Sequence, residues 1–196
     1  MFHNIPVDVK ERMKYLEEID SKDRRDETPG LRRLRQIPPE TGKFISLLAA
    51  SAPPGLYIEI GASAGYSALW LSLACMQTER KLVTFELQDD KIEMARETIS
   101  RAKIGKIVEL VEGNALDLLQ KYNNISFCFL DAEKEIYLDC YQIVVPKMVE
   151  GGILVADNVI SHREVLEPFI NHVMEDPRVD SLIVPIGKGE LVCRKL

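Results

Sequence analysis

LYIEIGASAGYS, residues 56–67, joins an apolar run of strand length to a glycine-containing loop that leads into a helical pattern. Leu56–Ile60 is short and almost entirely apolar, as expected for a strand that is covered on both faces of a parallel sheet. Gly61 and Gly65 allow the backbone to come close to another group, and the helix that follows begins with free N–H groups that can bind an anion. Such a loop is compatible both with a simple tight turn and with a ligand site.

Strands and helices alternate along the rest of the chain, which predicts an α/β doubly wound sheet. Further strands are expected at Leu82–Glu86, Ile107–Val111, Ile125–Leu130 and Ile153–Ala156, with helices at Val7–Ile19, Glu40–Ala50, Tyr66–Met76, Asp89–Ala102, Ala115–Tyr122, Glu135–Met148 and Arg163–Met174. Gly151 and Gly152 are expected where the helix before the fifth strand joins that strand. Ser181–Pro185 and Glu190–Arg194 flank the turn Gly187–Gly189, so the last strand is expected to be antiparallel.

Composition excludes several classes of protein. With 196 residues, of which 46% are hydrophobic and 29% charged, the chain is expected to form one domain, in which helices of residues 1–52 pack on residues 53–196. A net charge of −6 argues against a nucleic-acid partner. No apolar run reaches the roughly 18 residues of a membrane span, and the N-terminus lacks the apolar core of a signal peptide. The four cysteines show no CxxC spacing, which favours reduced thiols and a cytoplasmic location.

Glu86 ends the second expected strand and lies 86 − 61 = 25 residues after Gly61. An acid at this place can accept hydrogen bonds from both ribose hydroxyls of a nucleoside that lies across the strand ends, although it can also simply face solvent. The pyrophosphate of NAD favours a GxGxxG loop, which the sequence lacks. S-adenosylmethionine presents a carboxylate and an ammonium, which suit this shorter loop with Ser67 close by. Glu112–Ala115 ends the third strand, where its backbone N–H groups are expected to face the adenine ring.

A further group of polar residues follows the fourth and fifth expected strands. Asp131 comes after one strand, and Asp157 and Asn158 come after the other. Two carboxylates and an amide oxygen are the hard ligands that Mg²⁺ or Ca²⁺ prefers, whereas the lack of Cys or His disfavours zinc. Lys134 lies one helical turn beyond Asp131, so its ammonium is expected to reach the same cleft.

Five segments, in this order, resemble the cation-dependent small-molecule O-methyltransferases, the catechol and caffeoyl-CoA O-methyltransferase group. They are IEIGASAGYSALWLSLA, VTFELQDDKIEMAR, VEGNALDLL, FLDAEKEIYLDCY and GGILVADNV, and the similarity extends over residues 37–196. The resemblance implies a Rossmann-like sheet of seven strands with the class I methyltransferase order 3-2-1-4-5-7-6 and an antiparallel strand 7. Members of this group are often dimers, so a homodimer is expected.

The same resemblance implies roles for individual residues. S-adenosylmethionine would be bound by Ile37, Pro38, Glu59, Gly61, Ala62, Ser63, Gly65, Tyr66, Ser67, Glu86, Leu87, Gly113, Asn114, Ala115, Asp131 and Glu133. Asp131, Asp157 and Asn158 would hold Mg²⁺ or another divalent cation, and Lys134 would be the catalytic base. The predicted reaction is methyl transfer to a hydroxyl oxygen of a small catechol-like molecule.

The sequence departs from the family pattern near the acceptor. Glu133 stands where the family commonly has Asp, and the loop of residues 159–163 lacks the aromatic residue or insertion that often walls the acceptor pocket. Two alternatives therefore stay open: an acceptor other than a vicinal diol, and a protein that binds the cofactor without catalysis.

Overall fold

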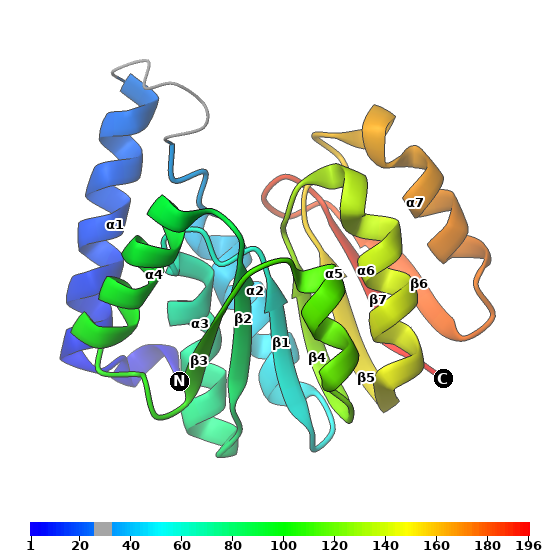
Figure 1. Cartoon of the computed structure of the whole chain (residues 1–196), viewed down its shortest axis with the longest axis horizontal. Helices are drawn as coiled ribbons and strands as arrows, with labels where there is room; N and C mark the ends of the chain where they lie inside the picture. The colour runs from blue at the N-terminus through cyan, green and yellow to red at the C-terminus, as the bar shows by residue number, and fades with distance from the viewer. Residues whose placement is uncertain (26–32) are drawn as a thin grey trace.

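The computed structural model describes residues 1–25 and 33–196, and in this part of the chain one seven-stranded sheet forms the centre of the molecule (Figure 1). The strands are β1 (Leu56–Ile60), β2 (Leu82–Glu86), β3 (Val108–Glu112), β4 (Ile125–Leu130), β5 (Met148–Ala156), β6 (Val179–Val184) and β7 (Glu190–Lys195). Their order is β3-β2-β1-β4-β5-β7-β6. Strands β1 to β5 pair in parallel, whereas β7 is antiparallel to both β5 and β6. The predicted fold class and strand order are confirmed.

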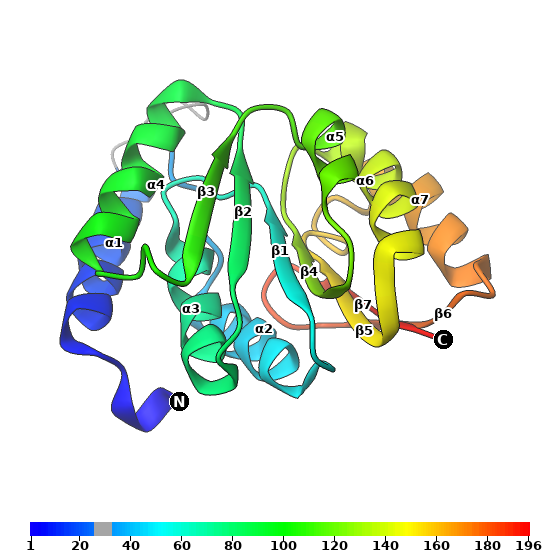
Figure 2. The same cartoon turned by 60° about the horizontal axis from the view of Figure 1, so that its bottom comes forward.

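Helices cover both faces of the sheet (Figure 2). They are α1 (Val7–Arg25), α2 (Pro39–Ser51), α3 (Tyr66–Thr78), α4 (Asp89–Arg101), α5 (Ala115–Leu118), α6 (Tyr137–Val144) and α7 (Arg163–Glu175), with short 3-10 turns at Phe2–Asn4, Leu119–Lys121, Lys134–Ile136 and Val145–Lys147. Side chains of α1 to α3 share one core cluster with the strands, and α4 packs against it. Side chains of α5 to α7 form a second cluster on the other face.

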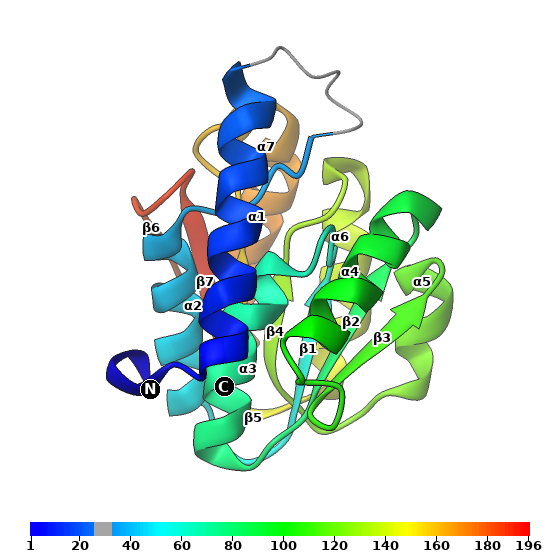
Figure 3. The same cartoon turned by 90° about the vertical axis from the view of Figure 1, so that its left-hand side faces the viewer.

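Helix α1 lies outside α3 and α4 (Figure 3). Val9, Met13 and Leu16 are spaced for one helix face and are buried against the core. The helix continues to Arg25, beyond the predicted end at Ile19, because polar residues extend it after the apolar stripe stops. The prediction that residues 1–52 form packed helices includes residues 26–32, which lie outside the described residues.

Strand β5 is longer than predicted and contains Gly151 and Gly152 instead of starting after them. Ile125 of β4 pairs with Met148 of β5, and Phe127 pairs with Ile153. An advance of two residues along β4 therefore corresponds to an advance of five along β5. Extra residues in one strand form a bulge, and glycines are suited to it. Gly151 has a φ of 75°, and a Cβ at Gly152 would lie 2.9 Å from the carbonyl oxygen of Val149. The two glycines are therefore part of the strand.

Other predicted boundaries also need correction. The helix predicted at Glu135–Met148 is divided into a 3-10 turn, α6 and a second 3-10 turn that contains Pro146, since proline disrupts continued helical hydrogen bonding. The helix predicted at Ala115–Tyr122 is α-helical only over its first turn, to Leu118. Strand β3 is shifted by one residue, and β6 begins at Val179 and ends before Pro185.

No helix among the described residues is long and apolar enough to cross a membrane. All four cysteines, which are Cys75, Cys128, Cys140 and Cys193, are buried and free.

Candidate active site

A cavity of about 590 Å³ opens at the carboxyl edge of the sheet, where β1 and β4 lie side by side. This is the point at which the strand order reverses direction, the usual place for ligands in doubly wound sheets. The loops after β1, β2, β3, β4 and β5 line the cavity, together with the segment before α2. Its volume lies within the range of small-molecule sites, about 300–1,000 Å³.

The glycines of the β1–α3 loop allow parts of the chain to pack closely. Gly61 and Gly65 have φ angles of 99° and 85°, which residues other than glycine rarely adopt. A Cβ at Gly61 would clash with the backbone oxygen of Asp131, and one at Gly65 would lie 3.1 Å from Cγ2 of Thr98. The sequence-based explanation, close approach of the backbone to a ligand, is therefore incomplete, because the fold itself already needs both glycines.

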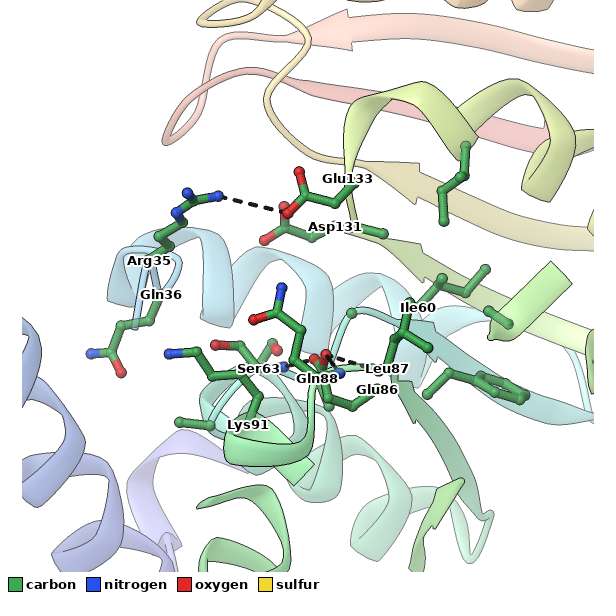
Figure 4. A pocket seen from close by; sticks show the side chains of 18 of the residues that line it. Arg35, Gln36, Ile60, Ser63, Glu86, Leu87, Gln88, Lys91, Asp131 and Glu133 are labelled. Carbon is green, nitrogen blue, oxygen red and sulfur yellow. Dashed lines mark hydrogen bonds and ion pairs between the residues drawn. The ribbon is translucent and has the colours of Figure 1, made fainter. Parts of the chain in front are cut away.

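Glu86 is held at the cavity by backbone N–H groups (Figure 4). The amide of Ser63 donates to Glu86 Oε2 at 2.7 Å, which joins the loops after β1 and β2. The amides of Leu87 and Gln88 donate to Oε1 at 2.9 and 3.0 Å. Each oxygen of the Glu86 carboxylate can accept a further hydrogen bond. The cavity wall therefore offers an ordered carboxylate to a ligand.

Glu59 lies on β1 and is fully buried. The pKa of Glu59 is raised to about 7, mainly by burial and in addition by the charges of Asp131 and Glu86, while the Ser67 and Thr84 hydroxyls act in the opposite direction. Thr84 Oγ1 donates to Glu59 Oε2 at 2.5 Å, whereas Oε1 has no hydrogen-bond partner among the described residues. An unpartnered buried acceptor is costly, so Glu59 has the properties of a group that awaits a donor.

Most of the residues predicted to bind S-adenosylmethionine line this one cavity. They are Ile37, Gly61, Ala62, Ser63, Tyr66, Ser67, Glu86, Leu87, Gly113, Asn114, Ala115, Asp131 and Glu133. Three do not: Glu59 is buried away from the cavity surface, Gly65 caps α3, and Pro38 lines a neighbouring cavity of about 430 Å³. Asn114 caps α5 by accepting a hydrogen bond from the Leu116 amide at 3.0 Å. Glu133 is exposed and forms an ion pair with Arg35 across the cavity mouth, at 3.8 Å (Figure 4).

The three predicted metal ligands meet between the ends of β4 and β5. The Asn158 amide nitrogen donates to Asp131 Oδ1 at 3.0 Å, and the Asn158 backbone N–H donates to Asp157 Oδ1 at 2.6 Å. Burial and the charge of Asp131 raise the pKa of Asp157 above its usual value. No group of three or more His, Cys, Asp or Glu residues suited to a metal occurs in the described part of the chain. The predicted ligand set differs from such a group, because it consists of two carboxylates and the side-chain amide of Asn158.

Glu190, at the start of β7, is a site residue that the sequence analysis missed. Its side chain is fully buried beside Asp157, and neither carboxylate oxygen has a hydrogen-bond partner among the described residues. Burial first, then the charge of Asp157, raises the pKa of Glu190 well above its usual value. The signal was the antiparallel pairing: Ala156 pairs with Leu191, which places Asp157 opposite Glu190.

Lys134 reaches the cleft, as predicted. Its Nζ lies 3.3 Å from Asp131 Oδ1, 2.8 Å from the Ala132 carbonyl oxygen and 2.9 Å from the Tyr137 hydroxyl. Tyr137 is buried, and its hydroxyl donates to the Asp157 carbonyl oxygen at 3.2 Å. Tyr137 therefore connects the loops that carry Lys134 and Asp157, a role that the sequence analysis did not assign.

Basic residues that the sequence analysis did not place in the site also line the cavity. They are Arg33, Arg35, Lys91, His162 and Lys188. The Lys91 ammonium donates to the Arg33 carbonyl oxygen at 2.9 Å, which holds the segment before α2 over the cavity. No pattern in the sequence indicated Arg33 or Arg35. Lys188 was foreseeable, because the turn before an antiparallel β7 must return to the carboxyl edge of β5.

Comparison with known proteins agrees with this geometry. A family model described as O-methyltransferase matches residues 7–196. The chain belongs to the O-methyltransferase family. This result confirms the resemblance noted in the sequence.

Relatives within the O-methyltransferase family include enzymes named for two acceptors. The catechol O-methyltransferase of Niastella koreensis is 32% identical over 136 residues, which cover 67% of this chain and 61% of that protein. The caffeoyl-CoA O-methyltransferase of Medicago sativa is 25% identical over 80% of this chain and 73% of its own. The SAH-bound methyltransferase PaMTH1 of Podospora anserina shares the fold, with a TM-score of 0.82, 24% identity, and coverage of 98% of this chain and 89% of its own.

Proposed function

We propose that the protein transfers the methyl group of S-adenosylmethionine to a hydroxyl oxygen of a small catechol-like acceptor, with help from a divalent cation. One observation carries the proposal: Glu86, at the nucleoside end, and Asp131, Lys134 and Asn158, at the other end, line the same cavity. A cavity of about 590 Å³ with these two ends has room for a nucleoside cofactor and a small acceptor.

Three features of the site suit S-adenosylmethionine, which supplies an electrophilic methyl group on a sulfonium centre. The Glu86 carboxylate, which accepts hydrogen bonds from three backbone amides, would accept further hydrogen bonds from ribose hydroxyls. Glu59, with its unpartnered Oε1 below the β1–α3 loop, would compensate positive charge at the methionine end. Gly113 to Ala115 would present backbone groups to adenine. The SAH-bound state of PaMTH1 supports this assignment by analogy.

Asp131, Asp157 and Asn158 would hold a divalent cation. Their donors are hard oxygens, as Mg²⁺ and Ca²⁺ prefer, and the repulsion between the Asp131 and Asp157 carboxylates would be relieved by a positive charge. The Asn158 amide would rotate, because its nitrogen now faces Asp131. A bound divalent cation would orient adjacent acceptor oxygens and lower the pKa of the attacking hydroxyl.

Lys134 would act as the base that accepts the hydroxyl proton of the methyl acceptor. Its Nζ is positioned by Asp131, by the Ala132 carbonyl and by Tyr137, so the amine is held at the acceptor end and away from the nucleoside end. Holding both substrates in near-attack geometry would contribute much of the rate increase.

Turnover of a panel of catechols with S-adenosylmethionine, with and without EDTA, tests the proposal, alongside calorimetry with S-adenosylhomocysteine. We expect methylation that disappears with EDTA and returns with excess Mg²⁺. Undiminished turnover in EDTA would contradict the role of the cation. Cofactor binding without turnover of any diol would instead indicate a protein with another acceptor or without catalysis.

A further inference from the structure

Lys188 lies in the tight turn between β6 and β7 and lines the cavity at its acceptor end. The flanking glycines, with φ angles of 56° and 95°, close the turn. The Lys188 carbonyl oxygen accepts hydrogen bonds from the Ile160 and Ser161 amides at 3.2 and 3.0 Å, which fixes the turn against the loop after Asn158. The Lys188 backbone is therefore anchored beside the predicted cation site.

The Lys188 ammonium forms no hydrogen bond or ion pair within residues 1–25 and 33–196. Lys134 differs, because it contacts Asp131, and Arg35 differs, because it contacts Glu133. A half-buried cation at a cavity wall without a carboxylate in contact can bind an incoming anion at little cost, since no existing pair has to be broken.

Other positive charges lie close to Lys188 at this end of the cavity. Burial lowers the pKa of His162, and the charges of Lys134, Lys188 and Arg35 lower it further, whereas the charge of Asp131 raises it. His162 also lines the cavity and precedes α7, whose N-terminus adds partial positive charge. Lys188 is therefore one of several positive groups that face the carboxylates of the predicted cation site.

We infer that the methyl acceptor is a vicinal diol arene that carries a carboxylate, and that Lys188, with His162 beside it, binds this carboxylate. The inference rests on the proposed function, because the diol would be oriented at Asp131, Asp157 and Asn158. A small carboxylate fits better than a large conjugate, since a cavity of about 590 Å³ must also accommodate the nucleoside cofactor.

A matched pair of acceptors tests the inference: protocatechuate, which is anionic, and its neutral amide of nearly equal shape. Both are assayed with saturating S-adenosylmethionine and Mg²⁺ on wild type, Lys188→Gln and Lys81→Gln. Lys81 is an exposed lysine just before β2, at the opposite edge of the sheet, and serves as the control. For wild type we expect kcat/KM to be about ten-fold higher for the anion than for the amide. This preference corresponds to the free energy of one charged hydrogen bond. Lys188→Gln should abolish this preference, and Lys81→Gln should retain it.

Binding of the same pair, measured by calorimetry in the presence of S-adenosylhomocysteine and Mg²⁺, separates the inference from the proposed reaction. If neither compound is methylated but the protein binds the anion more tightly than the amide, and Lys188→Gln removes this difference, then the proposed reaction is overturned and the carboxylate site is supported. Methylation of both acceptors with equal kcat/KM, a preference that survives in Lys188→Gln, or binding of neither compound would overturn the carboxylate site. Thermal denaturation of Lys188→Gln checks that the turn still folds.

Discussion

The side-chain amide of Asn158 donates a hydrogen bond to Asp131 Oδ1 at 3.0 Å, so the loops after β4 and β5 meet at a single carboxylate oxygen. The same oxygen is 3.3 Å from Lys134 Nζ. Asp131 is therefore shared between the predicted base and the predicted cation site. Changes at the cation site should consequently affect chemistry at the acceptor end more than binding at the nucleoside end.

Asp157→Ala should abolish cation-dependent turnover while cofactor binding is maintained. Removal of a ligand and a negative charge weakens the hold on Mg²⁺, and we expect kcat/KM to fall about a hundred-fold or more, since cation assistance contributes several kcal/mol. Affinity for S-adenosylhomocysteine, measured by calorimetry, should change little, because Asp157 does not line the cavity. Asp139→Ala, at an exposed acid of α6, is the control. Full turnover of Asp157→Ala would be incompatible with the assigned ligand set.

Glu86→Gln should weaken cofactor binding. The variant loses the charge that strengthens hydrogen bonds to ribose hydroxyls, each worth about 1.5–3 kcal/mol, so we expect an affinity at least about ten-fold lower. Glu112 gives a matched control, because it pairs in register with Glu86 on the neighbouring strand but does not line the cavity. Calorimetry with S-adenosylhomocysteine should show the loss in Glu86→Gln and none in Glu112→Gln. Equal affinities would mean that the nucleoside binds elsewhere.

The sheet was predictable from sequence because each parallel strand is a short apolar run between glycines or polar loops. The boundaries were less predictable where the backbone departs from regular structure. The bulge at Gly151 and Gly152 is set by pairing with β4, which a window of apolar residues cannot reveal. The helix before it ends early at Val144, ahead of Pro146, and this stop was visible in the sequence.

The site shows the same division. Asp131, Asp157, Asn158 and Lys134 were predictable, because the carboxyl ends of neighbouring parallel strands meet at one edge. Glu190 was not assigned, because its place beside Asp157 follows from the register of β7 against β5, which is a tertiary property. Arg33 and Arg35 lie in an irregular segment with no periodic pattern, so nothing local indicated that they line the cavity.

Glu190→Gln should stabilise the cation-free protein increasingly as pH rises. In the folded state the pKa of Glu190 is raised above its unfolded value of 4.5. The stability that comes from protonated Glu190 is therefore fully present when the pH is below 4.5. Above it the unfolded chain releases a proton that the folded chain retains, and stability falls by up to about 1.4 kcal/mol per pH unit. Glutamine does not titrate and avoids this loss.

Urea unfolding in EDTA at pH 5 and pH 8 measures the effect. The quantity to compare is the free energy of unfolding of Glu190→Gln minus that of wild type. We expect this difference to be larger at pH 8 than at pH 5 by at least about 1.4 kcal/mol. Glu150→Gln, at an exposed position near the other end of the sheet, should show no such trend. A pH-independent difference would mean that Glu190 does not titrate differently in the folded and unfolded states.

Lys134→Ala separates proton transfer from binding. Because Lys134 Nζ lies beside Asp131 and the Tyr137 hydroxyl, the variant should lose about 10²–10⁴-fold in kcat, the range for a positioned proton acceptor, with nearly unchanged affinity for S-adenosylhomocysteine. Higher pH should partly restore the rate, because hydroxide can then deprotonate the acceptor. Tyr137→Phe leaves the amine present but less well held, and we expect a smaller loss of kcat. pH–rate profiles of the three proteins distinguish the possibilities. A rise in KM with little change in kcat would show that Lys134 orients the acceptor, and a profile identical to wild type would exclude it from the reaction.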